Sequence, residues 1–243
     1  MTTARRSRRG ARPTRSLTAA VVASALALVC TGCAGGGSAK LDPQALLTGS
    51  KAKVDSTSSL HFSLTSSGVG NQGTKITGGN GDLARPDAMS GTFTVNVKGF
   101  PADVKVVSKG GVFEAQLPFM SGYVRTDPAN FGLKNPAELM DRQTGVTNLL
   151  SLAENPQAGP QVRIAGELLD TVTSTVPGND VPVLPDVAPD RPVTMVVAIN
   201  PKTLELRQVS LTGPFVTAAS DSTYVLLLTS YGAQVDITLP SAS

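Results

Sequence analysis

Alternating apolar and polar residues between Gly91 and Leu117 form the clearest pattern in the chain. Phe93, Val95 and Val97 fall on one side of an extended segment, and threonines and an asparagine fall on the other. The same alternation returns in 103–106 and in 113–117, after glycine-containing breaks. The pattern predicts three consecutive antiparallel strands with one apolar face, which another layer or a ligand must cover.

Further segments extend this sheet on both sides. Upstream, Asp42 and Pro43 predict the start of a helix, and 60–64 predicts a strand that continues more weakly through 75–77 and 81–83. Downstream of the meander, 122–126 predicts a short strand. The C-terminal part returns to strands, expected at 193–199, 204–211, 224–229 and 235–239. A change of apolar phase near Arg207 predicts a β-bulge in the second of them.

The middle of the chain has helical spacing instead. Asn135 and Pro136 predict the cap and first turn of a short helix, and Thr144 is expected to cap another that ends at 154–156. A third helix is expected over Glu167–Val176, because Leu169, Val172 and Val176 fall on one side of it. The five prolines of 177–192 predict a loop at the rim of the fold. Residues 41–240 therefore predict a single α+β domain, an antiparallel sheet with helices on one face.

The N-terminus predicts export. Six arginines and no acidic residue occupy the first 32 positions, and an apolar run of 13 residues, Leu17–Val29, is too short to span a membrane. The following Gly32-Cys33 resembles the lipobox of bacterial lipoproteins, although Cys30 stands where Leu is usual. We therefore expect a signal peptide over 1–32, lipidation of Cys33 and a flexible tether over 33–40. The alternative is a secreted protein cut at an Ala-x-Ala site, and Sec and twin-arginine export both stay open.

Composition removes several function classes. Without the first 32 residues the chain has 15 basic and 18 acidic side chains and no Trp, which argues against nucleic-acid binding. Gly68–Gly73 matches GxGxxG, but strand sequence follows it where a phosphate site needs a helix. The single histidine, His61, falls on the polar side of its strand, and two nearby cysteines without further ligands make no metal site. We expect neither an enzyme nor a cofactor.

The mature chain resembles the mycobacterial LppX/LprA/LprF/LprG lipoprotein family. The resemblance rests on the order and spacing of several segments: 42–43, 60–64, 91–117, 127–129, 144–150, 162–166 and 231–240. It implies a curved antiparallel sheet, or half-barrel, with helices on its concave face, enclosing an apolar cavity. It also implies a membrane-anchored carrier of acylated lipids or glycolipids, on the outer side of the cytoplasmic membrane, that works alongside a membrane transporter. Two departures from the family, a short 153–159 and a long 177–192, are expected at the cavity mouth.

On that basis the expected cavity lining comprises the inward positions Phe93, Val95, Val97, Val104, Val106, Phe113, Ala115, Leu117, Val146, Leu149, Leu150, Val197, Ile199, Val235 and Ile237. Periodicity alone does not distinguish a lipid cavity from an interior that the helices fill, because both need the same apolar faces. A cavity would admit a bulky side chain at Val95 at little cost, whereas a filled core would lose about 1 to 3 kcal/mol of stability. A scaffold that carries no lipid is the alternative function.

Overall fold

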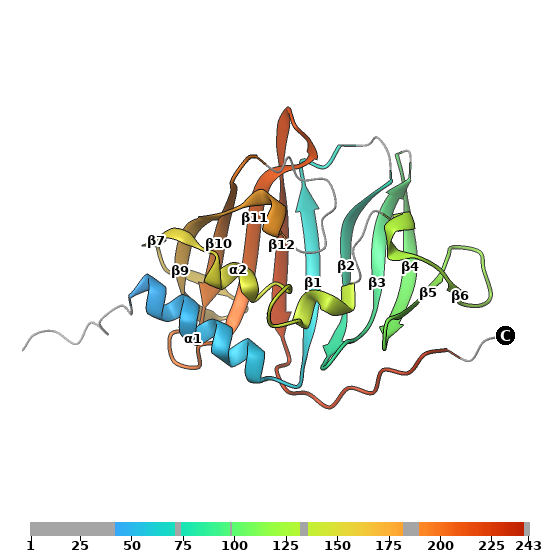
Figure 1. Ribbon diagram of the computed structural model, residues 1–243, viewed down its shortest axis with the longest axis horizontal. Coiled ribbons are helices and arrows are strands. Elements are labelled where there is room, and N and C mark those ends of the chain that lie inside the picture. The colour runs from blue at the N-terminus through green and yellow to red at the C-terminus, as the bar shows by residue number, and fades with distance from the viewer. Residues whose placement is uncertain (1–41, 71–73, 98, 132–135, 182–189, 241–243) are drawn as a thin grey trace, which may run out of the picture. The chain divides into compact units, whose positions relative to one another are not determined.

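The computed structural model describes residues 42–70, 74–97, 99–131, 136–181 and 190–240, which form one body dominated by a twelve-stranded antiparallel sheet (Figure 1). The strands are β1 Ser59–Ser67, β2 Thr74–Ala84, β3 Ala88–Val97, β4 Phe100–Lys109, β5 Val112–Gln116, β6 Val124–Arg125, β7 Glu154–Ala158, β8 Val162–Ile164, β9 Glu167–Val176, β10 Val193–Ile199, β11 Leu206–Thr217 and β12 Ser220–Thr229.

The sheet is open and follows the chain closely. Its order is β6-β5-β4-β3-β2-β1-β12-β11-β10-β9-β7, and β8 pairs with β9 outside this path. Only the β1–β12 contact joins the two ends of the chain, with Phe62 opposite Leu228. Every other neighbouring pair is a hairpin or a close connection, except β7 and β9, which β8 separates in the sequence. The open sheet matches the expected half-barrel.

Helical segments are few and lie against one face of the sheet (Figure 1). The α1 helix, Pro43–Ser56, begins as predicted, with an Asp42 carboxylate oxygen accepting a hydrogen bond from the Ala45 amide at 3.1 Å. It packs on α2, β7, β9 and β11. The other segments are α2 Asn148–Ser151 and the 3₁₀ turns η1 Pro128–Phe131, η2 Pro136–Met140 and η3 Gly178–Asp180. We call residues 136–153, which contain η2 and α2, the cover.

Glycines let β2 and β3 approach closely beside a pair of stacked aromatic side chains. Gly81 faces Gly91 across the ladder, and a Cβ atom at Gly81 would lie 2.2 Å from the Ser90 carbonyl oxygen. Phe62 and Phe93 stack above with ring centroids 5.8 Å apart. Gly81 is therefore required by the close approach of the β3 backbone, and Gly79 by the Phe93 ring, which a Cβ atom there would meet at 2.7 Å.

Several sequence predictions are confirmed. β3, β4 and β5 form the predicted meander, with Phe93 opposite Val104 and Val106 opposite Ala115. The bulge is also present: Ala198 pairs with Gln208 and Ile199 with Leu206, so Arg207 is the extra residue.

The third predicted helix is wrong, because Glu167–Val176 is strand β9. Its inward positions are Asp170, Val172, Ser174 and Val176, so two buried polar residues interrupt the apolar alternation and leave a helix-like spacing. The strand signal was the segment from Thr171 to Val176, in which every residue except Ser174 is β-branched.

Two other local predictions are also wrong. Thr144 does not cap α2, which starts at Asn148; its amide and hydroxyl instead donate to the Asp141 carboxylate at 2.7 and 2.9 Å. The segment 154–156, predicted only to end that helix, begins strand β7.

The C-terminal strand predicted at Val235–Leu239 is not formed; the segment is extended but belongs to no ladder. In the proline-rich loop, residues 178–180 form η3 and Val181 is buried. Residues 182–189 of that loop lie outside the described residues, as do Cys33, the tether and Asn135.

Candidate functional site

The inner face of the sheet carries one continuous apolar cluster, and most of the predicted lining residues belong to it. Eleven of them are buried in this cluster, and Leu117 packs against it while partly exposed. The eleven are Phe93, Val95, Val104, Val106, Phe113, Ala115, Val146, Leu149, Leu150, Val197 and Ile199. They come from both halves of the sheet and from the cover, so the fold brings distant parts of the sequence onto one surface.

Two predicted lining residues are placed elsewhere. Val235 and Ile237 belong to a second, smaller cluster with Ala88 and Val107. Ala88 and Val107 alternate with Met89 and Val106 of the main cluster, so the second cluster lies on the opposite face of the sheet. The Lys109 ammonium holds the segment there by donating to the Ile237 carbonyl at 2.7 Å. The side chain of Val97 lies outside the described part of the structure.

Around the predicted lining residues the interior is closely packed. Phe93 is 3 % exposed and Val95 is 2 % exposed, so neither faces a void large enough for water. The cover contributes to this packing through Met140, Leu149 and Leu150, all of which are buried. In this conformation the described side chains fill the space between sheet and cover at these positions.

Sequence reasoning missed the polar side chains of the interior. Ser174 on β9 and Ser222 on β12 are buried, and their hydroxyls have no hydrogen-bond partner within the described residues. Tyr224 is also buried; burial raises the pKa of its phenol to about 12. Its hydroxyl lies 3.4 Å from the Ile76 carbonyl, and its ring meets Phe215 edge to face. The alternation along β9 and β12 places these residues on the inner face, but it could be used only once both segments were known to be strands.

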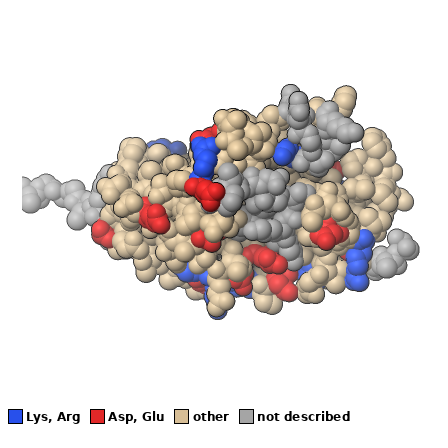
Figure 2. All heavy atoms as spheres, turned by 45° about the horizontal axis from the view of Figure 1, so that its top comes forward, with Lys and Arg blue, Asp and Glu red and all other residues tan. Residues whose placement is uncertain are grey.

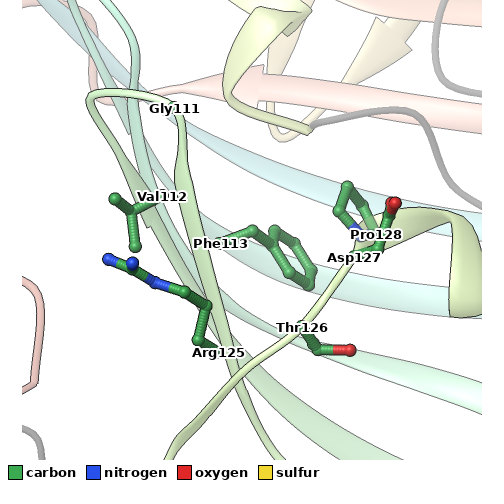
Figure 3. Close-up of a pocket in the computed structure, with 7 residues that line it drawn as sticks. All are labelled: Gly111, Val112, Phe113, Arg125, Thr126, Asp127 and Pro128. Carbon is green, nitrogen blue, oxygen red and sulfur yellow. The ribbon is translucent and has the colours of Figure 1, made fainter.

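A groove of about 440 Å³ opens at the β6 end of the sheet. It is lined by Gly111, Val112, Phe113, Arg125, Thr126, Asp127 and Pro128. Figure 3 shows Phe113 and Pro128 on one side of the strand, and Val112 and Arg125 on the other. Phe113 also contacts Phe131 of η1, with ring centroids 6.2 Å apart, so the groove borders the apolar interior.

A polar cluster ties the cover to α1. The Arg85 guanidinium donates hydrogen bonds to the carbonyls of Thr57, Val54 and Met140 and lies 3.6 Å from the Asp55 carboxylate. Asp55 also accepts a hydrogen bond from the Thr147 hydroxyl at 2.9 Å. Burial and the neighbouring Arg142 lower the pKa of Arg85, against the opposing charge of Asp55. This cluster is structural, since all these groups are occupied with one another.

A second cluster of charged side chains surrounds Arg207, the extra residue of the bulge. Arg207 forms ion pairs with Glu167 at 2.8 Å and Glu205 at 2.9 Å, and it lies over the Tyr231 ring. Hydrogen bonds from Arg207 and Asn200 lower the pKa of Glu167. Burial raises the pKa of Tyr231, whose hydroxyl donates to the Leu206 carbonyl at 2.6 Å. These contacts lie around Leu206, the first residue of β11.

The chain has a single histidine, His61. His61 is half-exposed, as predicted, and its Nδ1 lies 2.8 Å from the Asp82 carboxylate. Among the residues that the structure describes, no three His, Cys, Asp or Glu side chains gather as metal ligands would. Figure 2 shows charged side chains scattered over one face, separated by uncharged ones. Within the same described ranges, no helix has the length and apolar character needed to cross a membrane.

The combination of an open antiparallel sheet, a short helical cover and a continuous apolar inner face has a counterpart among known families. Residues 42–237 match the family model of the LppX_LprAFG lipoproteins. The chain belongs to this family. The match spans every strand of the sheet and both α-helices, so the LppX_LprAFG assignment covers the whole described domain.

Two solved LppX_LprAFG structures share the fold. LprF from Mycobacterium bovis superposes with a TM-score of 0.68 at 15% sequence identity, over 82% of this chain and 97% of that one. LppX from Mycobacterium tuberculosis gives a TM-score of 0.60 at 19% identity, over 80% and 97% of the two chains. A comparison with curated protein sequences gave no match.

Proposed function

We propose that this protein is a membrane-anchored lipid carrier. It binds acylated lipids or glycolipids between its sheet and its cover and helps to move them from the cytoplasmic membrane toward the outer envelope, together with a membrane transporter. The observation that carries this proposal is the extent of the apolar inner face. One continuous cluster runs over β1–β5 and β9–β12, yet within the described ranges the helical segments against it are only α1, the cover and the short turns η1 and η3.

The physical need for such a carrier is large. Each CH₂ group exposed to water costs about 0.8 kcal/mol, so two or three acyl chains cost tens of kcal/mol in transit. A protein that buries these chains against its own apolar face removes this cost. The family to which the chain belongs supports the membrane anchor, since its members are lipoproteins.

Because the interior is closely packed around Val95, loading requires a segment that lies against the sheet to move. The hydrogen bonds of Arg85 and Asp55 hold the cover at its α1 end. At the β5 end the contact to the neighbouring turn is aromatic, between Phe113 and Phe131. Apolar contacts of this kind can be exchanged for contacts with an acyl chain at little cost. We therefore propose that η1 moves away from β5 to admit the acyl chain while Arg85 and Asp55 hold the cover against α1.

Organic extraction and mass spectrometry of the purified protein, made without N-terminal acyl groups, test the carrier function. We expect a lipid with at least one long acyl chain, in near-stoichiometric amount after detergent-free purification. An unrelated soluble protein purified in parallel sets the background. An extract no richer in lipid than that background would contradict the proposal.

The alternative is a lipoprotein that acts as an interaction scaffold in the envelope. The packed interior favours it, because Phe93 and Val95 are almost fully buried without any ligand. The two functions differ in one outcome: a scaffold yields no lipid on extraction and is not stabilised by added lipid, whereas ligand binding stabilises a carrier.

Anchoring makes a separate prediction. We expect Cys33 to be acylated and residues 1–32 to be removed, since an apolar run ends at Gly32-Cys33. Two or more acyl chains would hold the protein stably in the membrane, on its extracytoplasmic side. The intact mass of membrane-extracted protein checks this, and Cys33→Ala should shift the protein to the soluble fraction. A mass that fits an unmodified N-terminus would contradict the prediction.

A further inference from the structure

The exposed large apolar side chains gather at one end of the sheet. Five such side chains are exposed in the described part of the chain, and four of them belong to residues 100–124. They are Phe100, Phe119, Met120 and Val124, carried by β4, β6 and the loop between β5 and β6. The fifth, Leu168, lies on β9 near the other end of the strand order. Solitary exposed apolar residues are ordinary, but a group at one edge indicates a contact surface.

Phe119 is the apex of this group, at 109 % exposure. Its backbone has φ 70, a conformation that side-chain-bearing residues seldom adopt and that glycine adopts freely. The loop is nevertheless fixed: the Met120 amide donates to the Leu117 carbonyl at 3.1 Å, and the Gln116 amide group donates to the Met120 carbonyl at 3.0 Å. The fold therefore holds a phenyl ring in water at a backbone position where glycine would be easier.

We propose that the loop of residues 118–122 inserts Phe119 and Met120 into the lipid bilayer. The loop projects from the edge of the sheet (Figure 1), and a bilayer can surround a projecting ring on all sides without providing a shaped pocket. A phenyl ring and a thioether are suited to the boundary between head groups and acyl chains. Membership of a lipoprotein family places the domain near such a surface.

The charges beside the loop fit a head-group layer. Lys105 and Arg125 are exposed on the strands that border the loop, and neither has an ion-pair partner within the described residues. Glu114 and Asp103 lie on the same strands, so apolar insertion rather than net positive charge provides the attraction.

Docking through this loop also fixes an orientation. The ten residues from Cys33 to Asp42 span at most about 36 Å. In Figure 1, α1 begins at the end of the sheet opposite β6. With Cys33 and Phe119 both at the membrane, the β6 end lies at the bilayer and the start of α1 lies within about 36 Å of it. The groove beside Arg125 then opens close to the bilayer.

The absence of tryptophan from the chain provides the test. Phe119→Trp gives a single tryptophan, which can be excited apart from the three tyrosines, in the membrane-extracted, anchored protein. This protein is reconstituted into protein-free vesicles of phosphatidylethanolamine and phosphatidylglycerol. We expect a blue-shifted emission and strong quenching by lipids brominated on their acyl chains. Leu168→Trp is the matched control, because Leu168 is also exposed, at 47 %, and should show neither effect.

Met120→Trp is a second reporter on the same loop, which keeps the test decisive if the indole at 119 disturbs the turn. Unshifted and unquenched emission from both reporters would overturn the proposal. A blue shift that needs membrane proteins in the vesicles would also overturn it, because the partner would then be a protein. Docking does not depend on lipid carriage: quenching is measured at the bilayer, and bound lipid is measured by extraction.

Discussion

Replacing Arg85 with methionine should lower the free energy of unfolding by about 3 to 5 kcal/mol, the largest loss that we expect from a single substitution outside the apolar core. Arg85 is 17 % exposed, and its guanidinium serves three backbone carbonyls as well as Asp55. Methionine keeps the apolar stem but leaves these acceptors without this donor. Buried acceptors that lose a partner cost about 1 to 3 kcal/mol each. Urea denaturation of delipidated protein measures the loss.

Arg142→Met is the matched control. Arg142 lies beside the same cluster and donates two hydrogen bonds to the Asp55 carbonyl, but it is exposed. Water can replace it, so the expected loss is below about 1 kcal/mol. Because Arg85 also holds the Met140 carbonyl, Arg85→Met should loosen the cover and speed lipid exchange, whereas Arg142→Met should not. Equal losses from both substitutions would show that Arg85 has no special structural role.

The part of the fold that sequence could predict is the part where packing is one-sided. Along 92–96, 103–106 and 113–117 one face meets the core and the other is open, so apolar and polar residues alternate there. The alternation breaks at Val107, whose side chain is buried on the opposite face. The capped start of α1 and the bulge at Arg207 were equally local signals. Each of these features depends on a few adjacent residues and not on contacts with distant parts of the chain.

Prediction failed where a segment is covered on both faces or packs without a ladder. In β9, Leu169 and Thr171 are buried on the outer side, where β8 pairs with the strand and the Pro160 carbonyl accepts a hydrogen bond from Thr171 at 2.6 Å. Asp170 and Ser174 occupy inward positions, so no simple period remains. The alternation of Val235 and Ile237 was real, but these side chains pack on the back of β3 and β4. Periodicity shows that a segment has an apolar side, and it does not show which surface that side meets.

The sequence could predict which residues share the inner face, but not whether that face lines a cavity. Eleven of the proposed lining residues do share one cluster, because inward alternation on each strand fixes the face to which they belong. Whether that face lines a cavity depends on how closely the cover packs, which is set by contacts between segments more than 40 positions apart. Burial of Val95 and Phe93 shows a close fit in this conformation, so a bulky side chain there is not expected to be free of cost.

If the protein is a carrier, Val95→Trp should lower both its stability and the amount of lipid that it binds. Val95 lies between Ile76 and Ala102 of the neighbouring strands and is 2 % exposed. An indole overpacks the closed interior, and we expect delipidated protein to lose about 1 to 3 kcal/mol of stability. In the loaded state the indole occupies volume that an acyl chain would take, so the extracted lipid should fall severalfold. Val95→Phe should give an intermediate result for both quantities.

Thr94→Trp is the control on the same strand. Thr94 points to the opposite face, where its hydroxyl donates to the Asp103 carboxylate at 2.8 Å in an exposed position. Its replacement should leave lipid content unchanged and cost less than about 1 kcal/mol. Added lipid should also raise the melting temperature of wild-type and Thr94→Trp protein more than that of Val95→Trp, since stabilisation by a ligand follows its affinity. If folded Val95→Trp retained the full lipid content, the lipid would lie elsewhere, and the inner face of β3 would be ordinary core.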